Sequence, residues 1–290
     1  MRGQLLEQES LAAYTSWRVG GLVRHCYKPA DLADLAEFLQ TVPMDESLLW
    51  LGLGSNTLIR DGGVAATAII TQGGLNALSW VDELTVRAEA GVACGQLARF
   101  TARAGLQNLE FLAGIPGTVG GALAMNAGCH GGETWDVVTE VETIDRLGQI
   151  HRRSKAEFKI AYRHVEKPIA DEWFVAGYFR LQMGNKEKSL ARIKTLLAHR
   201  EHTQPIDLPN CGSVFRNPPG DHAARLIEHC GLKGFQIGLA QVSPKHANFI
   251  INLGGATAKD IETLIATVAA TVLEKTGVDL IREVHIIGIE

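Results

Sequence analysis

Hydrophobic and polar positions follow a strand-like pattern through the first two thirds of the chain and a helical pattern through much of the last third. Apolar runs over residues 47–56, 66–71 and 84–91 predict strands, and the first of them leads into a glycine-rich turn. Segments 136–145 and 172–183 predict two further strands, which we assign to a mixed sheet. The first part of the chain is therefore expected to be built around sheets.

Helical spacing first occurs in two short segments of this strand-rich part. Asp31 is placed to cap a helix over residues 31–40, whose leucines fall on one face. A second helix is predicted over 94–105, where Gly105 is suited to end it.

After residue 185 the helical period dominates. Helices are predicted over 186–203, 221–231 and 257–276, and a closing strand over 280–290. Thr257 caps the last helix, and its buried stripe is Ile261, Leu264, Ile265, Val268 and Val272. The change of pattern predicts an α+β fold with two domains, residues 1–185 and 186–290.

Composition narrows the class of protein. The 290 residues are 46% hydrophobic and 21% charged, with a formal net charge of −4, which favours a globular protein over a nucleic-acid binder. No apolar run reaches the roughly 20 residues that span a bilayer, and glutamates interrupt the N-terminal region where a signal peptide needs an apolar core. We expect a cytoplasmic protein without membrane insertion.

Cysteine and histidine spacing gives no sign of a metal site. The five cysteines never occur as C-x-x-C, and no two histidines are spaced as H-x-x-x-H with a carboxylate between them. We therefore expect reduced thiols, no disulfide framework and no bound metal.

Two glycine-rich loops are the candidate ligand-binding segments. The first is residues 52–56, directly after an apolar strand, and the second is residues 114–133. Glycines let backbone N–H groups approach a diphosphate closely, but neither loop is a Walker A or a Rossmann fingerprint. Taken alone, the first loop is equally compatible with a tight turn in a strand-rich domain. The candidate contacts are Gly52, Leu53, Gly54, Ser55, Asn56, Gly114, Ile115, Pro116, Gly117, Thr118, Gly120, Gly121, Asn126, Ala127 and Gly128.

The stretches "LGLGSNTLIRDGG" and "GIPGTVGGALAMNAG" resemble the FAD-binding domain of the p-cresol methylhydroxylase and vanillyl-alcohol oxidase superfamily. Within it, the chain is similar to the family of UDP-N-acetylenolpyruvoylglucosamine reductases. The similarity continues through "YTSWRVGG", "AYR", "CGSVFRNP", "LKGFQIGLAQVSPKHANFIIN" and "EVHIIG". These motifs occur in the family's order and cover nearly the whole chain.

The resemblance implies a fold, a cofactor and a reaction. It implies a PCMH/VAO-type FAD-binding domain followed by a smaller α+β substrate-binding domain, with FAD held noncovalently although Cys129 lies inside the second loop. NADPH would donate hydride to FAD, which would then reduce UDP-N-acetylglucosamine enolpyruvate to UDP-N-acetylmuramate for peptidoglycan. We expect a monomer that works on small molecules.

The resemblance also implies catalytic roles for three residues. Ser213 matches the serine that protonates the substrate, Arg163 the arginine that pairs with its carboxylate, and Glu283 the acid that stabilises the enolate-like intermediate. From the residues alone, a loop serine bonded to its own backbone is the favoured interpretation of Ser213. Likewise, Arg163 and Glu283 are compatible with ordinary surface positions.

Asn217, Gln241 and His246 fall at or beside positions of the family that contact the sugar nucleotide, although His246 taken alone is better interpreted as a structural histidine. The chain departs from the family's pattern at Val165, where a serine is usual, and at Arg216, where lysine is common. It also has only about ten residues between Arg163 and the next strand. It therefore resembles the short-loop subclass, and the sequence does not indicate how the substrate diphosphate is held.

Two other functions stay open at this point. The first is an oxidase of a small alcohol or phenol built on the same flavin domain, although the last third, about 105 residues, is short for an oxidase cap. The second is a sugar-nucleotide-binding or regulatory protein without flavin. The intact second glycine loop, together with Arg163, Ser213 and Glu283, favours the reductase over both.

Overall fold

The computed structural model describes all residues from 1 to 290, and the chain forms two compact units. The glycine-loop unit comprises Met1–Leu6, His25–Leu53 and Ala66–His199. The serine-loop unit comprises Glu7–Arg24, Gly54–Ala65 and Arg200–Glu290. Two early segments thus join the C-terminal residues in the second unit. The domain division at residue 185 stays a prediction.

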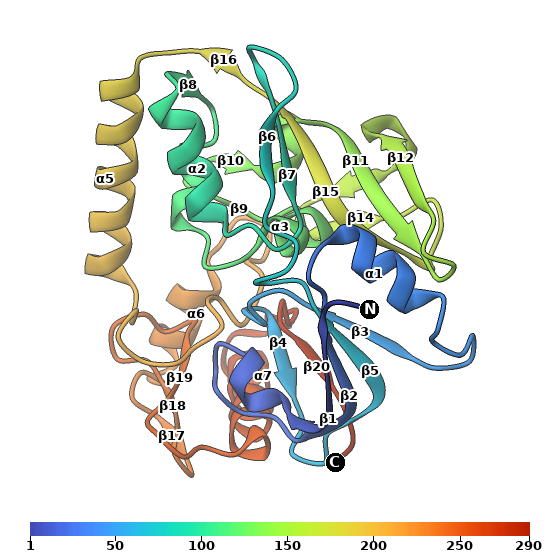
Figure 1. Cartoon of the computed structure of the whole chain (residues 1–290). Helices are drawn as coiled ribbons and strands as arrows, with labels where there is room; N and C mark the ends of the chain where they lie inside the picture. The colour runs from blue at the N-terminus through green and yellow to red at the C-terminus, as the bar shows by residue number, and fades with distance from the viewer. The chain divides into compact units, whose positions relative to one another are not determined.

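The glycine-loop unit is organised by a five-stranded sheet of order β12-β11-β15-β7-β6 (Figure 1). Its strands are β6 (Leu78–Trp80), β7 (Thr85–Glu89), β11 (Val138–Asp145), β12 (Ile150–Ser154) and β15 (Glu172–Arg180). Every pair in it is antiparallel, so the predicted mixed sheet is wrong. The connection from β11 to β12 is a tight turn, whereas a parallel pair would need a crossover of a dozen or more residues.

Parallel pairing occurs elsewhere in the chain. A four-stranded sheet has the order β1-β2-β5-β3, and in it β3 (Leu48–Leu51) pairs in parallel with β5 (Val64–Ile70). The other two strands are β1 (Gln4–Ser10) and β2 (Leu22–Lys28). Helix α1 (Leu32–Leu39) begins after Asp31, whose side chain accepts from Asp34 N as the sequence predicts.

Three helices pack their apolar residues into the core of the five-stranded sheet. They are α2 (Cys94–Arg103), α3 (Val119–Met125) and α5 (Lys186–Thr203). Gly105 has a φ of 79° just after α2, as expected of a residue that ends a helix. Ile193 of α5 and Leu97 of α2 belong to one buried cluster, and the two helices lie side by side in Figure 1.

The remaining elements of this unit are short. They are β8 (Leu106–Gln107), η2 (Glu110–Gly114), β9 (Gly128–Cys129), β10 (Gly132–Glu133), α4 (Thr134–Val137), η3 (Lys155–Glu157), β13 (Lys159–Ala161), β14 (His164–Glu166) and β16 (Gln182–Met183).

The serine-loop unit is built around helix α7 (Ala258–Thr276), which Thr257 caps through Asp260 N. All five residues of its predicted stripe are buried, which confirms the predicted face. Around it lie η1 (Leu11–Tyr14), β4 (Thr57–Ile59), α6 (Ala223–His229), β17 (Gln236–Ile237), β18 (Ala240–Val242), β19 (Ile250–Asn252) and β20 (His285–Ile287). Strand β20 pairs in parallel with β4.

The closing strand is shorter than the sequence predicts. Only His285–Ile287 form β20, whereas the pattern predicts one strand over residues 280–290. The preceding residues bond to a loop instead, because Arg282 makes an isolated antiparallel bridge with Phe215. As a result, the C-terminal segment contacts the loop of residues 210–220, which carries Ser213 and is called the serine loop.

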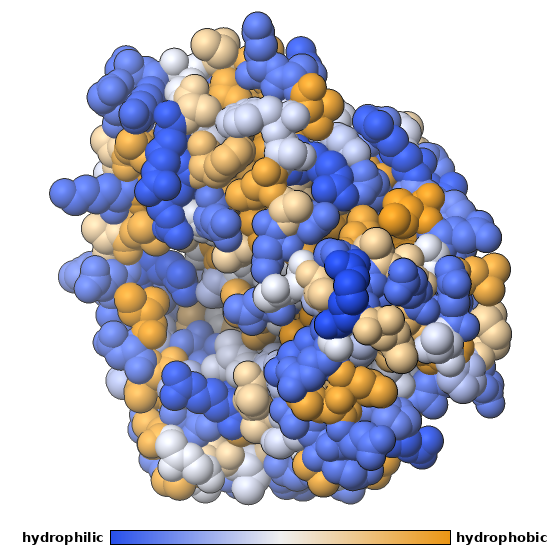
Figure 2. Space-filling view, in the orientation of Figure 1, coloured by the Kyte–Doolittle hydropathy of each residue, from blue (hydrophilic) through white to orange (hydrophobic).

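The molecule has no helix that combines the length and the apolar character needed to span a membrane. On the face seen in Figure 2, hydrophilic and hydrophobic residues are interspersed. All five cysteines are free thiols.

Candidate functional site

The second glycine loop is a turn and a helix rather than an extended loop. Thr118 precedes helix α3, and the amides of Val119 and Gly120 donate to Val92 O and Ala90 O, both at 2.9 Å. These bonds fix the start of α3 against the segment that follows β7. The sequence pattern did not reveal this helix, because its glycines and small residues lack an amphipathic period.

Gly52 and Thr118 leave a polar atom available for a ligand. A Cβ on Gly52 would collide with Thr118 Oγ1, so only glycine allows this approach. Thr118 is 1% exposed, yet its hydroxyl has no hydrogen-bond partner. A buried hydroxyl without a partner costs free energy, about 1–3 kcal/mol, and a bound ligand removes that cost.

A cavity of about 190 Å³ opens beside these residues. Gly52, Gly120 and Gly121 line it together with Trp50 and Trp173, whose rings stack at 5.2 Å. Trp50 Nε1 is also buried without a partner. A space of this size with one aromatic wall suits one ring system of a dinucleotide.

Lys167 also lines this cavity and was not found from the sequence. Its Nζ donates to the carbonyl oxygens of Ala170, at 2.6 Å, and Glu172. Burial lowers the pKa of Lys167 from its ordinary value, against the opposing charges of Asp171 and Glu172. Sequence offers no signal for it, because only the fold brings residue 167 beside the glycine loop.

Asn126 shapes the second loop through its own side chain. It ends α3 in the left-handed conformation, at a φ of 44°. Its Nδ2 donates to Glu133 Oε2 at 2.8 Å and to Ala161 O at 3.2 Å, and its Oδ1 accepts from Trp135 N at 3.1 Å. This side chain is committed to the loop, and direct contact of Asn126 with a cofactor stays a prediction.

Arg163 lies in the two-residue turn between β13 and β14, with a φ of 54°. Its Nη2 donates to Gly128 O at 2.7 Å and its Nη1 to Asn126 O at 3.4 Å. The guanidinium is therefore oriented by the backbone of the glycine loop. The structure brings together two segments that the sequence treated separately, the predicted flavin loop and the predicted carboxylate-binding arginine.

The first glycine loop is divided between the two units after Leu53. Gly54 has a φ of 56°, and a Cβ on it would collide with Tyr14 O. Of the other predicted contacts, Gly114 ends η2 and Gly128 begins β9, and the rest lie in the irregular parts of the two loops: Leu53, Ser55, Ile115, Pro116, Gly117 and Ala127. The amides of Ile115, Gly117 and Ala127 are bonded within their own turns.

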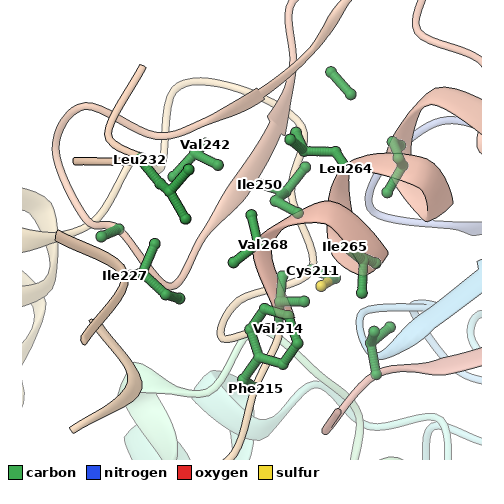
Figure 3. Packing of buried hydrophobic residues seen from close by; sticks show 14 of the residues in the cluster. Cys211, Val214, Phe215, Ile227, Leu232, Val242, Ile250, Leu264, Ile265 and Val268 are labelled. Carbon is green, nitrogen blue, oxygen red and sulfur yellow. The ribbon is translucent and has the colours of Figure 1, made fainter. Parts of the chain in front are cut away.

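The loop that carries Ser213 is anchored by apolar side chains. Cys211, Val214 and Phe215 are 5%, 0% and 2% exposed and belong to the core around α7. Figure 3 shows Val214 and Phe215 beside Val268 of that helix. Ser213 itself is half-buried, and its hydroxyl makes no hydrogen bond to the protein. The alternative of a serine bonded to its own backbone is therefore wrong.

Glu283 is joined to the serine loop through the backbone. Its N–H donates to Val214 O at 2.8 Å, and its carbonyl accepts from Asn56 Nδ2 at 3.2 Å. Burial, with the nearby charge of Glu283, raises the pKa of the Cys211 thiol well above its usual range. Ser213 and Glu283 are thus held in one part of the serine-loop unit. The structure places Asn56, a predicted cofactor contact, beside Glu283.

The predicted sugar-nucleotide residues occupy three places in the same unit. Asn217 is exposed, with its Oδ1 accepting from Ala223 N at 3.1 Å. Gln241 lies on β18 and donates to Gly234 O at 3.2 Å. His246 packs edge-on against Phe249, and its Nδ1 accepts from Asn248 N at 3.3 Å. Burial lowers the pKa of His246 from its ordinary value.

Family models and known proteins are similar to the chain over almost its whole length. A model described as "FAD binding domain" matches residues 23–154, and one described as "UDP-N-acetylenolpyruvoylglucosamine reductase, C-terminal domain" matches residues 204–287. The UDP-N-acetylenolpyruvoylglucosamine reductase of Legionella pneumophila (strain Corby) is 61% identical over 288 residues, 99% of this chain and 93% of the relative.

A second relative and a solved structure agree with these matches. The reductase of Alkalilimnicola ehrlichii is 58% identical over 286 residues, 99% of this chain and 95% of the relative. The crystal structure of UDP-N-acetylenolpyruvylglucosamine reductase from Thermus caldophilus has a TM-score of 0.83 and 33% identity. It covers 99% of this chain, and all of that chain is matched. The expected α+β fold, an FAD-binding domain followed by a C-terminal reductase domain, is confirmed.

Proposed function

Because the chain belongs to the UDP-N-acetylenolpyruvoylglucosamine reductase family, we propose that Ser213 protonates the substrate in the reaction that this family carries out. The chain is an FAD-dependent oxidoreductase that reduces the enolpyruvyl group of UDP-N-acetylglucosamine enolpyruvate in peptidoglycan precursor synthesis, and NADPH is the family's hydride donor. The roles of the individual residues are the subject of the proposal.

The observation that carries the proposal is the unpartnered hydroxyl of Ser213 on a rigidly anchored loop. A serine hydroxyl is too weak an acid to protonate most groups, so it must face a strongly basic carbon from a fixed position. Addition of hydride to the outer alkene carbon leaves negative charge on the inner carbon and its carboxylate. Transfer of the Ser213 proton to that inner carbon completes the reduction and leaves a serine oxyanion, which takes a proton from water.

Arg163 and Glu283 have supporting roles in this proposal. Arg163 pairs with the substrate carboxylate, for which a planar guanidinium is suited. The two carbonyls of the glycine loop that it already contacts hold its plane before substrate arrives. Glu283 stabilises the enolate-like charge from the segment next to the serine loop. The family's motifs support both assignments, and so does the backbone bond from Glu283 N to Val214 O.

The glycine-loop unit fits FAD. When bound, FAD supplies hydride transfer between NADPH and the outer alkene carbon. Gly52, Gly120 and Gly121 line the space that would take part of the dinucleotide, and Thr118 Oγ1 and Trp50 Nε1 are the buried groups left to hydrogen-bond it. We place Gly54 and Gly117 among the residues that shape the loops around it, and FAD stays noncovalent beside Cys129.

Asn217, Gln241 and His246 bind the sugar nucleotide in this proposal, and the enzyme acts as a cytoplasmic monomer. The support is their position on the C-terminal reductase domain and in motifs shared with the family. The Nδ1 of His246 is occupied by Asn248 N–H, so the neutral ring offers Nε2–H as a donor.

Anaerobic single-turnover kinetics test the proton-donor role. Ser213→Ala is expected to leave reduction of bound flavin by NADPH within about twofold of wild type, and to slow its reoxidation by the enolpyruvyl substrate by several orders of magnitude. Equal slowing of both half-reactions would show that the substitution damages the flavin site instead. Reoxidation by oxygen but not by the enolpyruvyl substrate in the wild type would favour the oxidase reading.

A further inference from the structure

Asn248 makes contacts that the reaction, as described so far, does not explain. Its side chain is 4% exposed and lies among the apolar residues around α7. A primary amide in such surroundings is costly unless its donor and acceptor are both bonded.

Both ends of the Asn248 amide bond to the same residue of the serine loop. Oδ1 accepts from Phe215 N at 3.0 Å, and Nδ2 donates to Phe215 O at 2.8 Å. The backbone carbonyl of Asn248 also accepts from Val214 N at 2.9 Å. One residue therefore binds three of the four backbone polar groups in the two residues after Ser213.

The fourth backbone group, Val214 O, is bonded by another residue. We call these four hydrogen bonds to Val214 and Phe215 the clamp. Val214 O accepts from Glu283 N at 2.8 Å. Consequently, every backbone polar group of Val214 and Phe215 is bonded, and the two bonds to the Asn248 side chain are buried. Hydrogen bonds buried in this way are strong, and their loss leaves unsatisfied groups. These bonds hold the backbone of Val214 and Phe215, to which Ser213 is directly joined.

Asn248 also connects this clamp to the predicted sugar-nucleotide residue His246. Its N–H donates to His246 Nδ1 at 3.3 Å. The turn between them is closed by Ser243, whose hydroxyl accepts from Lys245 N and His246 N. A single residue thus touches both the loop of the proton donor and a residue assigned to substrate binding.

The geometry points to Asn248 as a positioning residue for proton transfer, which sets the Ser213 hydroxyl relative to the carbon that it protonates. The inference rests on the proposed function, because it needs Ser213 to be the proton donor. A displacement of about 1 Å in such a group can cost about 100-fold in rate. Asn248 is assigned no contact with a reacting atom, and in this inference its effect on the rate passes through Ser213.

Two substitutions probe the clamp in the FAD-loaded, full-length enzyme. Asn248→Ala removes both side-chain bonds. Asn248→Asp keeps the acceptor for Phe215 N but replaces the donor to Phe215 O with an oxygen. Asn252→Asp is the matched control, because Asn252 is also 4% exposed and its amide also bonds backbone groups, those of Trp17, Gly254 and Ala256.

Asn248→Asp is expected to slow flavin reoxidation by the enolpyruvyl substrate about 100-fold while reduction by NADPH stays within about twofold of wild type. The rate relative to wild type should recover as the pH falls, because protonation of the introduced carboxyl restores a donor to Phe215 O. Asn252→Asp should lower the melting temperature without selective loss of reoxidation. Equal slowing of both half-reactions by Asn248→Asp, or the same selective loss in Asn252→Asp, overturns the inference.

The double variant, Ser213→Ala with Asn248→Asp, is the decisive experiment. In a Ser213→Ala background, Asn248→Asp should slow reoxidation by less than about twofold, because the group that it positions is gone. A further loss of about 100-fold there would show that Asn248 acts independently of Ser213 and would overturn the positioning role. If Ser213→Ala alone reoxidises at the wild-type rate, the proposed function fails and this inference fails with it. If the Asn248 variants reoxidise flavin at the wild-type rate while Ser213→Ala does not, the proton-donor role of Ser213 stands and the positioning role of Asn248 is wrong.

Discussion

The glycine loops and the serine loop differ in how their polar groups are hydrogen-bonded. In the second glycine loop Thr118 Oγ1 is buried without a partner, and so is Trp50 Nε1 on strand β3, which precedes the first glycine loop. In the serine loop, every backbone polar group of Val214 and Phe215 is bonded, and the half-buried Ser213 hydroxyl makes no hydrogen bond to the protein. The first arrangement leaves polar atoms that a bound molecule must satisfy. The second holds one reactive group still.

This difference indicates how each region depends on its ligand. The glycine loop carries an energetic cost without a cofactor, because buried polar groups without partners are unfavourable. The serine loop gains its rigidity from the core of α7 and from Asn248, and needs no ligand for it. We therefore expect changes in the glycine loop to alter flavin affinity, and changes at the serine loop to alter a single chemical step.

Gly52→Ala should have the largest effect on flavin binding. The added methyl group meets Thr118 Oγ1 in a buried place, and overpacking of this kind costs about 1–3 kcal/mol. Flavin affinity should fall about 10- to 100-fold, measured by titration of the apoprotein with FAD. Gly95→Ala is the control, because its methyl group would meet only Arg99 and Ala113 at ordinary distances of 3.5 Å or more. An equal loss of FAD affinity in both variants would contradict the assignment of Gly52 to the flavin site.

Thr118→Val tests two effects of the unpartnered hydroxyl, its effect on the stability of the flavin-free protein and its effect on FAD affinity. We expect the flavin-free protein to gain about 1 kcal/mol of stability, because a buried unsatisfied group is removed. FAD affinity should fall up to about tenfold, the loss of one hydrogen bond. Thermal unfolding of the apoprotein and FAD titration measure the two effects.

Thr101→Val is the matched control for that substitution. Thr101 is 2% exposed, but its hydroxyl donates to Leu97 O and Ala98 O. Its replacement should destabilise the protein and leave FAD affinity unchanged. If Thr118→Val destabilises the apoprotein as Thr101→Val does, the contrast between the two loops does not hold.

The smallest effect concerns pH in the serine-loop unit. Burial holds the pKa of His246 below its ordinary value of about 6.5, so the ring stays neutral as the pH falls through that value. Protonation at lower pH would turn Nδ1 into a donor and break its bond with Asn248 N–H. Calorimetric affinity for the sugar nucleotide should therefore be flat from about pH 8 to about pH 6.5 in the wild type. A loss of affinity centred at or above about pH 6.5 that His246→Gln abolishes would contradict this.

Elements with a clear period could be predicted from the sequence. The stripe and cap of α7, the cap of α1 by Asp31 and the end of α2 at Gly105 depend on neighbours within a few residues, and all are confirmed. The family resemblance covered what local pattern could not, since no single motif identifies a flavin loop.

The rest depends on contacts between distant segments. The antiparallel order of the main sheet, the bond from Glu283 N to Val214 O and the cavity lining by Lys167 all join residues that lie far apart in the sequence. No local pattern encodes such pairs. Asn248 was missed for a related reason: a buried asparagine in "KHANF" looks like any polar loop residue until its partner Phe215 is known.

The fate of solvent deuterium tests most directly whether Ser213 delivers the proton. In D₂O the wild-type enzyme should place one deuterium on the inner carbon of the new lactyl group, on a single face. The slow residual product of Ser213→Ala should carry deuterium on both faces, because water then protonates the carbon without a fixed donor. Single-face deuteration by Ser213→Ala at the wild-type rate of flavin reoxidation would contradict the account.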